Sequence, residues 1–273
     1  MAPLVGNLAL LAMVMATMAI EVMPRYSSTA SDMGCQRAMT ELLPALNYSE
    51  FQKNPLFARV WVKAMAEWQR WGAPESPLSP AQATAIMAYT MKDMYQEFNA
   101  AMRVARHSPQ EYRDNFHFKT LHFLLTQAVA TLRDAQKWKC TELHQKVCGV
   151  QFEAKHGDIV HFGEFLSTLL SETSGNCSWK VTFLHVYTCQ GVDIGFFSDN
   201  SLNCGLLIPP FETFEVTQIT KTRDKAVIYL RSTGTHSIND CEWLQGGSIS
   251  MAPFHLGGFL LATTVMAVAT GIL

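Results

Sequence analysis

The stretches 206–216, LLIPPFETFEV, and 162–170, FGEFLSTLL, decide how the second half of this chain is organised. In the first stretch a short apolar run meets a proline pair, and a segment rich in β-branched and aromatic residues follows. Such segments, bounded by Pro, Gly, Asn or Asp, are typical of strands. We therefore predict a strand at 212–219. Segments of the same character predict further strands at 147–154, 179–189 and 226–232.

The residues between Cys35 and Lys137 predict helices instead. The segment 57–71, FARVWVKAMAEWQRW, repeats apolar residues every three or four positions. The pairs Ser79-Pro80 and Ser108-Pro109 each place a capping serine before a proline, which favours a helix start. Further helical segments are 95–105 and 116–133. A helical half followed by a β half indicates the α+β class, and we expect one shared core because no linker-like composition separates the halves.

Composition narrows the class of protein. The chain has 273 residues, a formal net charge of −2 and 16% charged residues. A nucleic-acid-binding protein would carry a basic stripe, so we expect no nucleic-acid partner. The histidines form no metal constellation, since His117 and His122 lie five residues apart where a helical ligand pair needs four. We therefore expect no metal.

The two apolar ends predict an exported protein. Residues 8–20 form a short apolar run followed by polar residues, which favours a secretory signal at 1–19 over a buried helix. The apolar tail follows small residues and has no basic residue after it, which is typical of a glycosylphosphatidylinositol (GPI) attachment signal. We expect one ectodomain at 20–245 and removal of 246–273. The chain would then lie on the outer leaflet of the plasma membrane, with a tail-anchored or secreted form as the alternative.

Seven cysteines in an exported chain predict disulfides, because their wide spacing does not suit a zinc site. They are Cys35, Cys140, Cys148, Cys177, Cys189, Cys204 and Cys241. Seven is odd, so at least one thiol is left over or pairs between chains. Asn47 and Asn176 begin Asn-X-Ser sequons and are expected glycosylation sites.

The two quoted stretches occur with WVKAMAEWQRWG, EYRDNFHFKTLHFLLTQA and YLRSTGTHSINDC, and together they resemble the vertebrate ecto-mono-ADP-ribosyltransferases. The avian and other arginine-specific members are the most similar. The resemblance covers roughly residues 35–243. It implies an ADP-ribosyltransferase fold, in which helices pack on one side of a split pair of β-sheets that form an NAD cleft. It also implies NAD as cosubstrate and a protein arginine as acceptor.

The resemblance places the family's signature residues on five positions. The two glutamates of the family's Glu-x-Glu pair fall on Asn203 and Gly205. The first serine of its Ser-x-Ser signature falls on Ser167, and the second on Leu169. The arginine that grips NAD phosphate falls on Gln145. Lys146, the next residue, would be the substitute cation after a slip of one residue.

The resemblance implies further contacts and crosslinks. Tyr89, Glu164 and Ser198 would touch NAD, although from the residues alone Tyr89 is expected in the core. Glu164 stands where the family commonly has Gln, and its charge would repel the pyrophosphate. Family disulfides would join Cys35 to Cys241 and Cys140 to Cys189. Two of the three remaining cysteines are expected to pair.

The replaced glutamates predict weak or absent catalysis. Cleavage of the nicotinamide–ribose bond passes through an oxocarbenium-like state, which a carboxylate stabilises. Losing one such contact costs about 10²–10³ in rate. Glu212 and Glu215 lie on opposite faces of a strand and cannot act as a pair, so we expect ordinary polar roles for them. The alternative function is a catalytically silent, lipid-anchored recognition protein on the same scaffold.

Overall fold

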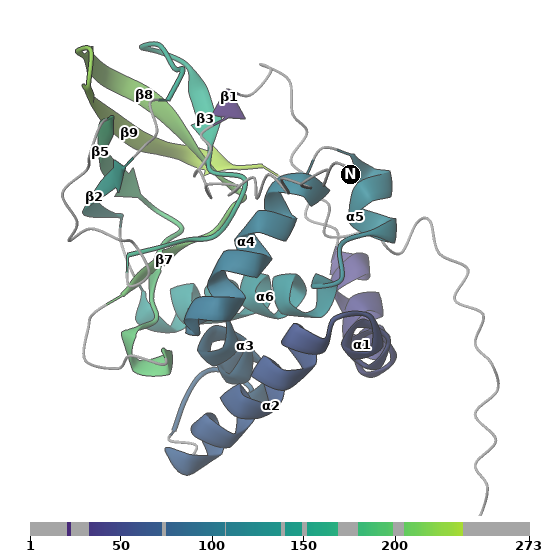
Figure 1. The fold of residues 1–273 in the computed structure, drawn as a ribbon. Helices are drawn as coiled ribbons and strands as arrows, with labels where there is room; N and C mark the ends of the chain where they lie inside the picture. Colours follow the sequence, from purple (N-terminus) through teal and green to yellow (C-terminus); the bar gives the residue numbers. More distant parts are fainter. Residues whose placement is uncertain are drawn as a thin grey trace, which may run out of the picture.

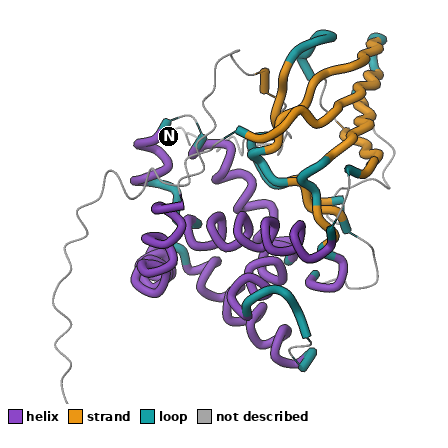
Figure 2. The backbone as a smooth tube through the Cα atoms, turned by 180° about the vertical axis from the view of Figure 1, so that it is seen from behind, coloured by secondary structure: helices purple, strands orange, loops and turns teal. Residues whose placement is uncertain are grey.

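The computed structural model describes residues 21–22, 33–72, 75–106, 108–137, 140–148, 152–168, 180–198 and 205–236. After the two-residue strand at 21–22, helices precede strands along the described chain, as the sequence predicts. The helices gather on one side of the molecule and the larger sheet on the other (Figure 1). The view from behind in Figure 2 shows the same division.

Six α-helices form the helical half of the described chain: α1 (Met33–Lys53), α2 (Pro55–Arg70), α3 (Pro80–Thr90), α4 (Lys92–Ala105), α5 (Pro109–Asp114) and α6 (Lys119–Gln136). Both predicted serine caps are confirmed. The Ser79 side chain accepts from Gln82 N, whose own side chain closes a capping box, and Ser108 accepts from Glu111 N. Serine oxygens satisfy N–H groups that the first turn of a helix leaves unpaired.

Helix α6 begins three residues later than predicted. The buried carboxylate of Glu50, on α1, accepts hydrogen bonds from Lys119 N at 2.6 Å and Thr120 N at 2.9 Å. An anion at this end of a helix satisfies free N–H groups and complements the helix dipole. Phe116 and Phe118 instead pack in the aromatic core. The cap comes from a residue 69 positions away, so local sequence could not reveal it.

The described strands form two sheets. The strands are β1 (Glu21–Val22), β2 (Thr141–Cys148), β3 (Ile159–His161), β4 (Leu166–Ser167), β5 (Val181–Thr188), β6 (Val192–Asp193), β7 (Leu206–Ile208), β8 (Glu212–Lys221) and β9 (Lys225–Thr235); a short 3-10 helix, η1, spans Gly195–Phe197. The six-stranded sheet has the order β1-β3-β8-β9-β5-β2, and the three-stranded sheet has the order β4-β7-β6. Only the β5–β9 pairing is parallel.

One predicted strand was misplaced. The strand expected at 147–154 is β2, which ends at Cys148 and pairs with β5 along its whole length. Its sequence, TELHQKVC, is polar because β2 is an edge strand and exposes one face. Phe152 and Ala154 are buried without belonging to a strand. Their burial, rather than strand pairing, explains the apolar pattern there.

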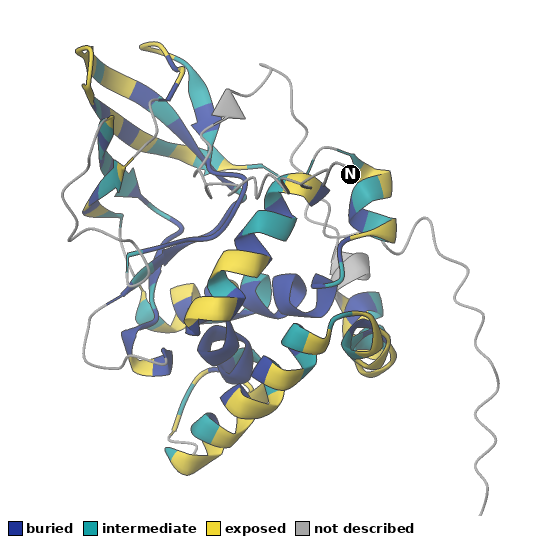
Figure 3. Ribbon diagram, in the orientation of Figure 1, coloured by how far each residue is buried: buried dark blue, intermediate teal, exposed yellow. Residues whose placement is uncertain are grey.

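The core has two hydrophobic clusters rather than one. The first joins the helices to the small sheet and includes Phe165 and Leu207. The second lies within the β half and includes Leu166 and Ile208. Neighbouring residues of a strand point to opposite faces, so the small sheet contributes to both clusters. The buried residues concentrate on the helices and strands that meet at this junction (Figure 3).

The structure contains the expected disulfide between Cys140 and Cys189, which ties the start of β2 to the end of β5. Cys148 is also disulfide-bonded. The expected Cys35–Cys241 pair, Cys177 and Cys204 lie outside the described residues or side chains. None of the described helices is long and apolar enough to cross a bilayer.

Candidate functional site

The small sheet brings the two signature stretches side by side. Ser167, on β4, lies opposite Leu207, on β7. One residue further, Thr168 N donates to Leu206 O at 3.0 Å, and Leu206 N donates to Thr168 Oγ1 at 2.9 Å. The position predicted for a catalytic serine therefore lies on the strand next to the one that Gly205 precedes.

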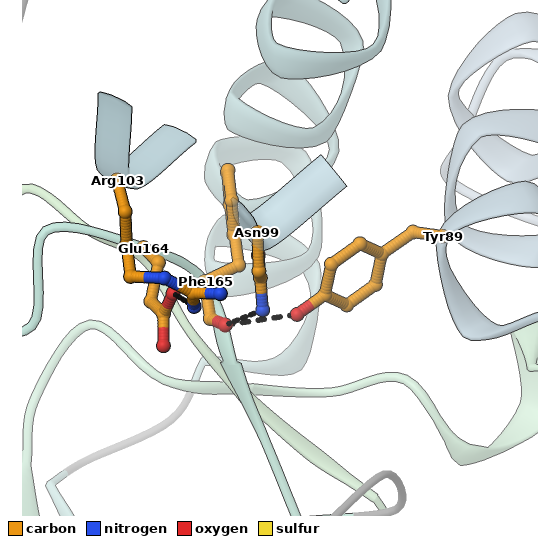
Figure 4. A network of polar contacts seen from close by, with 5 residues as sticks. All are labelled: Tyr89, Asn99, Arg103, Glu164 and Phe165. Atoms are coloured by element: carbon orange, nitrogen blue, oxygen red, sulfur yellow. Dashed lines mark hydrogen bonds and ion pairs between the residues drawn. The ribbon is translucent and has the colours of Figure 1, made fainter. Parts of the chain in front are cut away.

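Two side chains of the helical half fix the segment that leads into β4 (Figure 4). Tyr89 Oη donates to Phe165 O at 2.9 Å, and Asn99 Nδ2 donates to the same oxygen at 3.1 Å. Both residues are buried. The ring of Phe165 packs against those of Phe98 and Tyr89. These contacts set where the backbone enters β4, and hence where Ser167 lies.

The contact of Tyr89 with NAD stays a prediction, and the contact that the structure shows for its hydroxyl is with the scaffold. Tyr89 is fully buried in the helical core, and its hydroxyl is engaged by Phe165. Burial raises the pKa of the Tyr89 phenol well above its ordinary value. The phenol is thus a neutral donor inside the core, and its role is to position the backbone of the site.

Glu164 is an ionisable group buried beside two arginines. Its carboxylate forms an ion pair with Arg103 on α4, also drawn in Figure 4. Burial raises the pKa of Glu164 to about 7, although Arg103 and Arg106 oppose the shift. The expected repulsion of a pyrophosphate is therefore reduced, since the charge is paired. Contact of Glu164 with NAD stays a prediction.

Gly163 is required by its surroundings. Its φ of +66° lies in the left-handed region, and a Cβ there would stand 2.4 Å from Arg106 Nη1. Glycine is the residue that tolerates both conditions. The turn at 162–165 is thus held by α4 through Asn99 and Arg103, and Arg106, the residue after α4, packs closely beside Gly163.

Glu212 anchors the turn after β5. Its buried carboxylate accepts from Thr188 Oγ1, from Cys189 N at 2.7 Å and from Gln190 N at 3.1 Å. Burial raises its pKa, while these bonds and one from Ser232 lower it. Both carboxylate oxygens of Glu212 therefore accept hydrogen bonds from the scaffold. The expected structural role of Glu212 is confirmed, and Glu215 lies half-buried further along β8.

Helix α6 holds the same turn from the other side. Gln136 Nε2 donates to Asp193 O at 2.8 Å, and Asp193 N donates to Gln136 Oε1 at 3.1 Å. Arg133 donates to Gln190 Oε1. Ser198 Oγ, expected near NAD, donates to Gly195 O at 3.0 Å and closes η1. Its contact with NAD stays a prediction.

Gly205 contributes backbone only. It is buried, and its carbonyl accepts a hydrogen bond from Ile194 N at 2.8 Å. Asn203 and Leu169 lie outside the described residues. Gln145 belongs to the other sheet, where it is buried on β2 opposite Leu184. The structure thus brings Ser167 and Gly205 to adjacent strands and places Gln145 apart from them in the topology.

Several residues that hold this site together were not predicted from the sequence. They are Asn99, Arg103, Arg106, Gln136 and Thr188. A signal existed, because Asn99 follows Phe98 on the apolar face of a helix, where an amide needs a partner. The partner itself lies 66 residues away and could not be inferred.

Comparisons with known proteins agree with this architecture. Residues 26–238 match the family model described as NAD:arginine ADP-ribosyltransferase. NAD(P)(+)--arginine ADP-ribosyltransferase 2 of Gallus gallus is 44% identical over 216 residues, covering 78% of this chain and 69% of that protein. GPI-linked NAD(P)(+)--arginine ADP-ribosyltransferase 1 of Homo sapiens is 37% identical over 243 residues, covering 82% and 74%.

Among solved structures, the eukaryotic mono-ADP-ribosyltransferase ART2.2 superposes with a TM-score of 0.62 at 24% identity, covering 77% of this chain and 93% of that one. At this identity the likeness concerns the fold. It matches a helical half packed on two sheets, as described above.

Proposed function

The chain belongs to the NAD:arginine ADP-ribosyltransferase family, and from this we propose that it is a scaffold for NAD and an arginine-bearing protein with severely reduced transfer chemistry. One observation carries the proposal. The segment that should supply the catalytic carboxylate enters β7 through Gly205, which offers only backbone.

The fold that this chain shares with a solved relative supports NAD as the ligand. ART2.2 variants at one glutamate have been solved in complex with NADH and with NAD. The fold of that protein superposes on this chain with a TM-score of 0.62. We propose that Ser167, which is fully buried on β4 beside β7, hydrogen-bonds a ribose hydroxyl of NAD. We assign the NAD cleft to the edge of the small sheet.

The expected loss of transfer rate follows from the charge that develops in the transition state. As nicotinamide leaves, positive charge develops on the ribose, and a nearby carboxylate stabilises it. Gly205 supplies no charge, and an asparagine at position 203 is neutral. A single missing contact of this kind costs about 10²–10³ in rate. Losses within one catalytic unit are not additive, so we expect at least this factor.

A second function is favoured by the same glycine. A surface protein that recognises partners through this scaffold needs no carboxylate at position 205. Relatives described as GPI-linked support display on the outer leaflet of the plasma membrane, with 20–245 as the ectodomain and 246–273 removed. Glycosylation of Asn47, half-buried on α1, and of Asn176 belongs to this proposal.

The test uses the purified ectodomain, labelled NAD and an arginine-rich acceptor. Direct titration measures NAD binding, and label on the acceptor measures transfer. We expect NAD to bind and transfer to be at least ~10²-fold slower than with the chicken relative assayed alongside. Transfer at the relative's rate would refute the reduced-chemistry proposal. Failure to bind NAD would favour the recognition protein.

A further inference from the structure

The outer face of the six-stranded sheet carries a row of aromatic and imidazole rings across three strands. His144 on β2 lies directly opposite His185 on β5, and His185 lies beside Tyr229 on β9. His144 is exposed, His185 is half-buried and Tyr229 is exposed. This row lies on the opposite face from the buried Leu143 and Leu184, so it takes no part in the core.

The two imidazoles face each other closely. Their ring centroids are 4.4 Å apart with an interplanar angle of 74°, and the His185 ring stacks on Tyr229 at 4.4 Å and 19°. Within the part of the chain that is described, neither imidazole forms a hydrogen bond or a salt bridge, and Glu142 is the carboxylate whose charge acts on His185. Their nitrogens are thus available to a ligand.

We propose that His144 and His185 form a binding site for a divalent transition-metal ion such as Cu²⁺, Ni²⁺ or Zn²⁺. Neutral imidazole is the commonest metal ligand in proteins and suits these ions. Metal–nitrogen bonds of about 2.0–2.1 Å require the two nitrogens to stand about 3.0–3.4 Å apart. Rings whose centroids lie 4.4 Å apart on facing strands reach this separation by rotation of the side chains.

Two protein ligands leave the remaining positions to water. No group of three or more His, Cys, Asp and Glu suited to a metal occurs among the described residues. The site is exposed, so water completes the coordination. Glu142 and Lys146 flank His144 at two-residue spacing on the same face, and their opposite charges largely offset each other at the ion.

The ion would crosslink an edge strand. Within the described sheet, strand β2 has one neighbour, β5; the Cys140–Cys189 disulfide holds one end of this pair, and Cys148, at the other end of β2, is disulfide-bonded as well. A metal bridge from His144 to His185 would hold the middle of it. An ion that binds the folded chain and not the unfolded chain raises stability by mass action. Metal binding is therefore expected to raise the thermal midpoint.

The test uses the protein purified from cells that express the full chain, freed of metal with a chelator. Titration with CuCl₂, NiCl₂ and ZnCl₂ is followed by calorimetry and thermal unfolding. We expect one ion per chain and a higher midpoint. His144→Ala and His185→Ala should each weaken binding about tenfold or more, because one of two ligands is lost. His156→Ala, at an exposed turn away from this sheet row, is the matched control.

The outcomes decide between this site and others. Equal binding by the wild type and by both strand variants would overturn the proposal. So would a loss of equal size in the His156 variant. If His144→Ala lowers stability without metal, His144→Gln keeps the bulk at an exposed position and repeats the measurement. Retention of binding and of the midpoint shift in that variant would also contradict the site.

Discussion

Two segments of the small sheet meet at the candidate site, and they are built differently. The segment 162–165 is held by Tyr89, Asn99, Arg103 and Arg106 of the helical half. The residue that enters β7, Gly205, is held by one backbone hydrogen bond to Ile194 among the described contacts. The first segment is thus fixed by side chains of the helical half, whereas position 205 contributes backbone alone. A carboxylate aimed at a substrate adds little to packing, so its loss leaves the fold intact.

The largest effect should come from restoring the missing charges. Asn203→Glu with Gly205→Glu returns a carboxylate to the ribose and another to the acceptor arginine. We expect arginine transfer to rise by at least ~10²-fold. Label transferred from NAD to an arginine-rich acceptor measures it.

The matched control is the neutral pair Asn203→Gln with Gly205→Gln. An equal gain in both double variants would show that charge is not the missing element. If neither double variant gains transfer activity, another part of the cleft limits the reaction. Adding Gln145→Arg to the glutamate pair then tests the second replaced position.

Replacing the structural carboxylate of Glu212 should lower stability, whereas the catalytic position affects transfer activity. Glu212→Gln places an amide against the N–H groups of Cys189 and Gln190. We expect the free energy of unfolding to fall by about 2–4 kcal/mol, because buried donors lose a charged acceptor. Urea denaturation measures it. Glu215→Gln, half-buried on the same strand, should change stability by about 0.5 kcal/mol or less; similar losses in both variants would contradict the assigned role.

The Arg103–Glu164 pair should make stability depend on pH. Because burial raises the pKa of Glu164 to about 7 from 4.5, the folded chain keeps this proton where the unfolded chain has released it. Stability from this group is therefore present at low pH and is lost as the pH rises from 4.5 through 7. Glu164→Gln removes the effect.

Urea denaturation at pH 5 and pH 8 checks this prediction. We expect the wild type to lose about 1–3 kcal/mol more than Glu164→Gln between the two values. Glu50 and Glu212, whose pKa values are also raised by burial, contribute equally to both proteins. Parallel losses in the two proteins would contradict the buried, partly protonated carboxyl.

The smallest effect should come from Tyr89→Phe. The change removes one of two donors to Phe165 O, while Asn99 still satisfies that oxygen. We expect a loss of about 0.5–1.5 kcal/mol in unfolding free energy. Thermal unfolding measures it, with Tyr48→Phe as the control at a side chain that is 68% exposed. No difference between the two variants would show that the hydroxyl does not hold the segment.

Local patterns predicted most of the fold. Serine–proline caps gave the starts of α3 and α5, and β-branched runs gave β5, β8 and β9. These signals depend on neighbours in sequence. The start of α6 and the end of β2 were wrong, because a distant carboxylate and an edge pairing decide them.

The site was predicted unevenly for the same reason. Resemblance assigned signature positions to Ser167 and Gly205, and the structure shows that Ser167 lies on β4 next to the strand β7, which Gly205 precedes. Tyr89 lies in the core, as the residues alone predict, and its contact with NAD stays a prediction, since a tyrosine on an apolar helix face looks alike in both roles. The contacts of Asn99 and Arg103 span more than 60 residues and have no local signature.

A structure of the ectodomain with bound NAD tests the central claim most directly. The quantity to measure is the distance from the ribose 2′-hydroxyl to the nearest carboxylate oxygen of the protein. The account predicts that no carboxylate lies within hydrogen-bonding reach, about 3 Å, and that the backbone of Gly205 faces the sugar. An acidic side chain from another segment within that reach would contradict the account, because the chain would then keep the group that its chemistry requires.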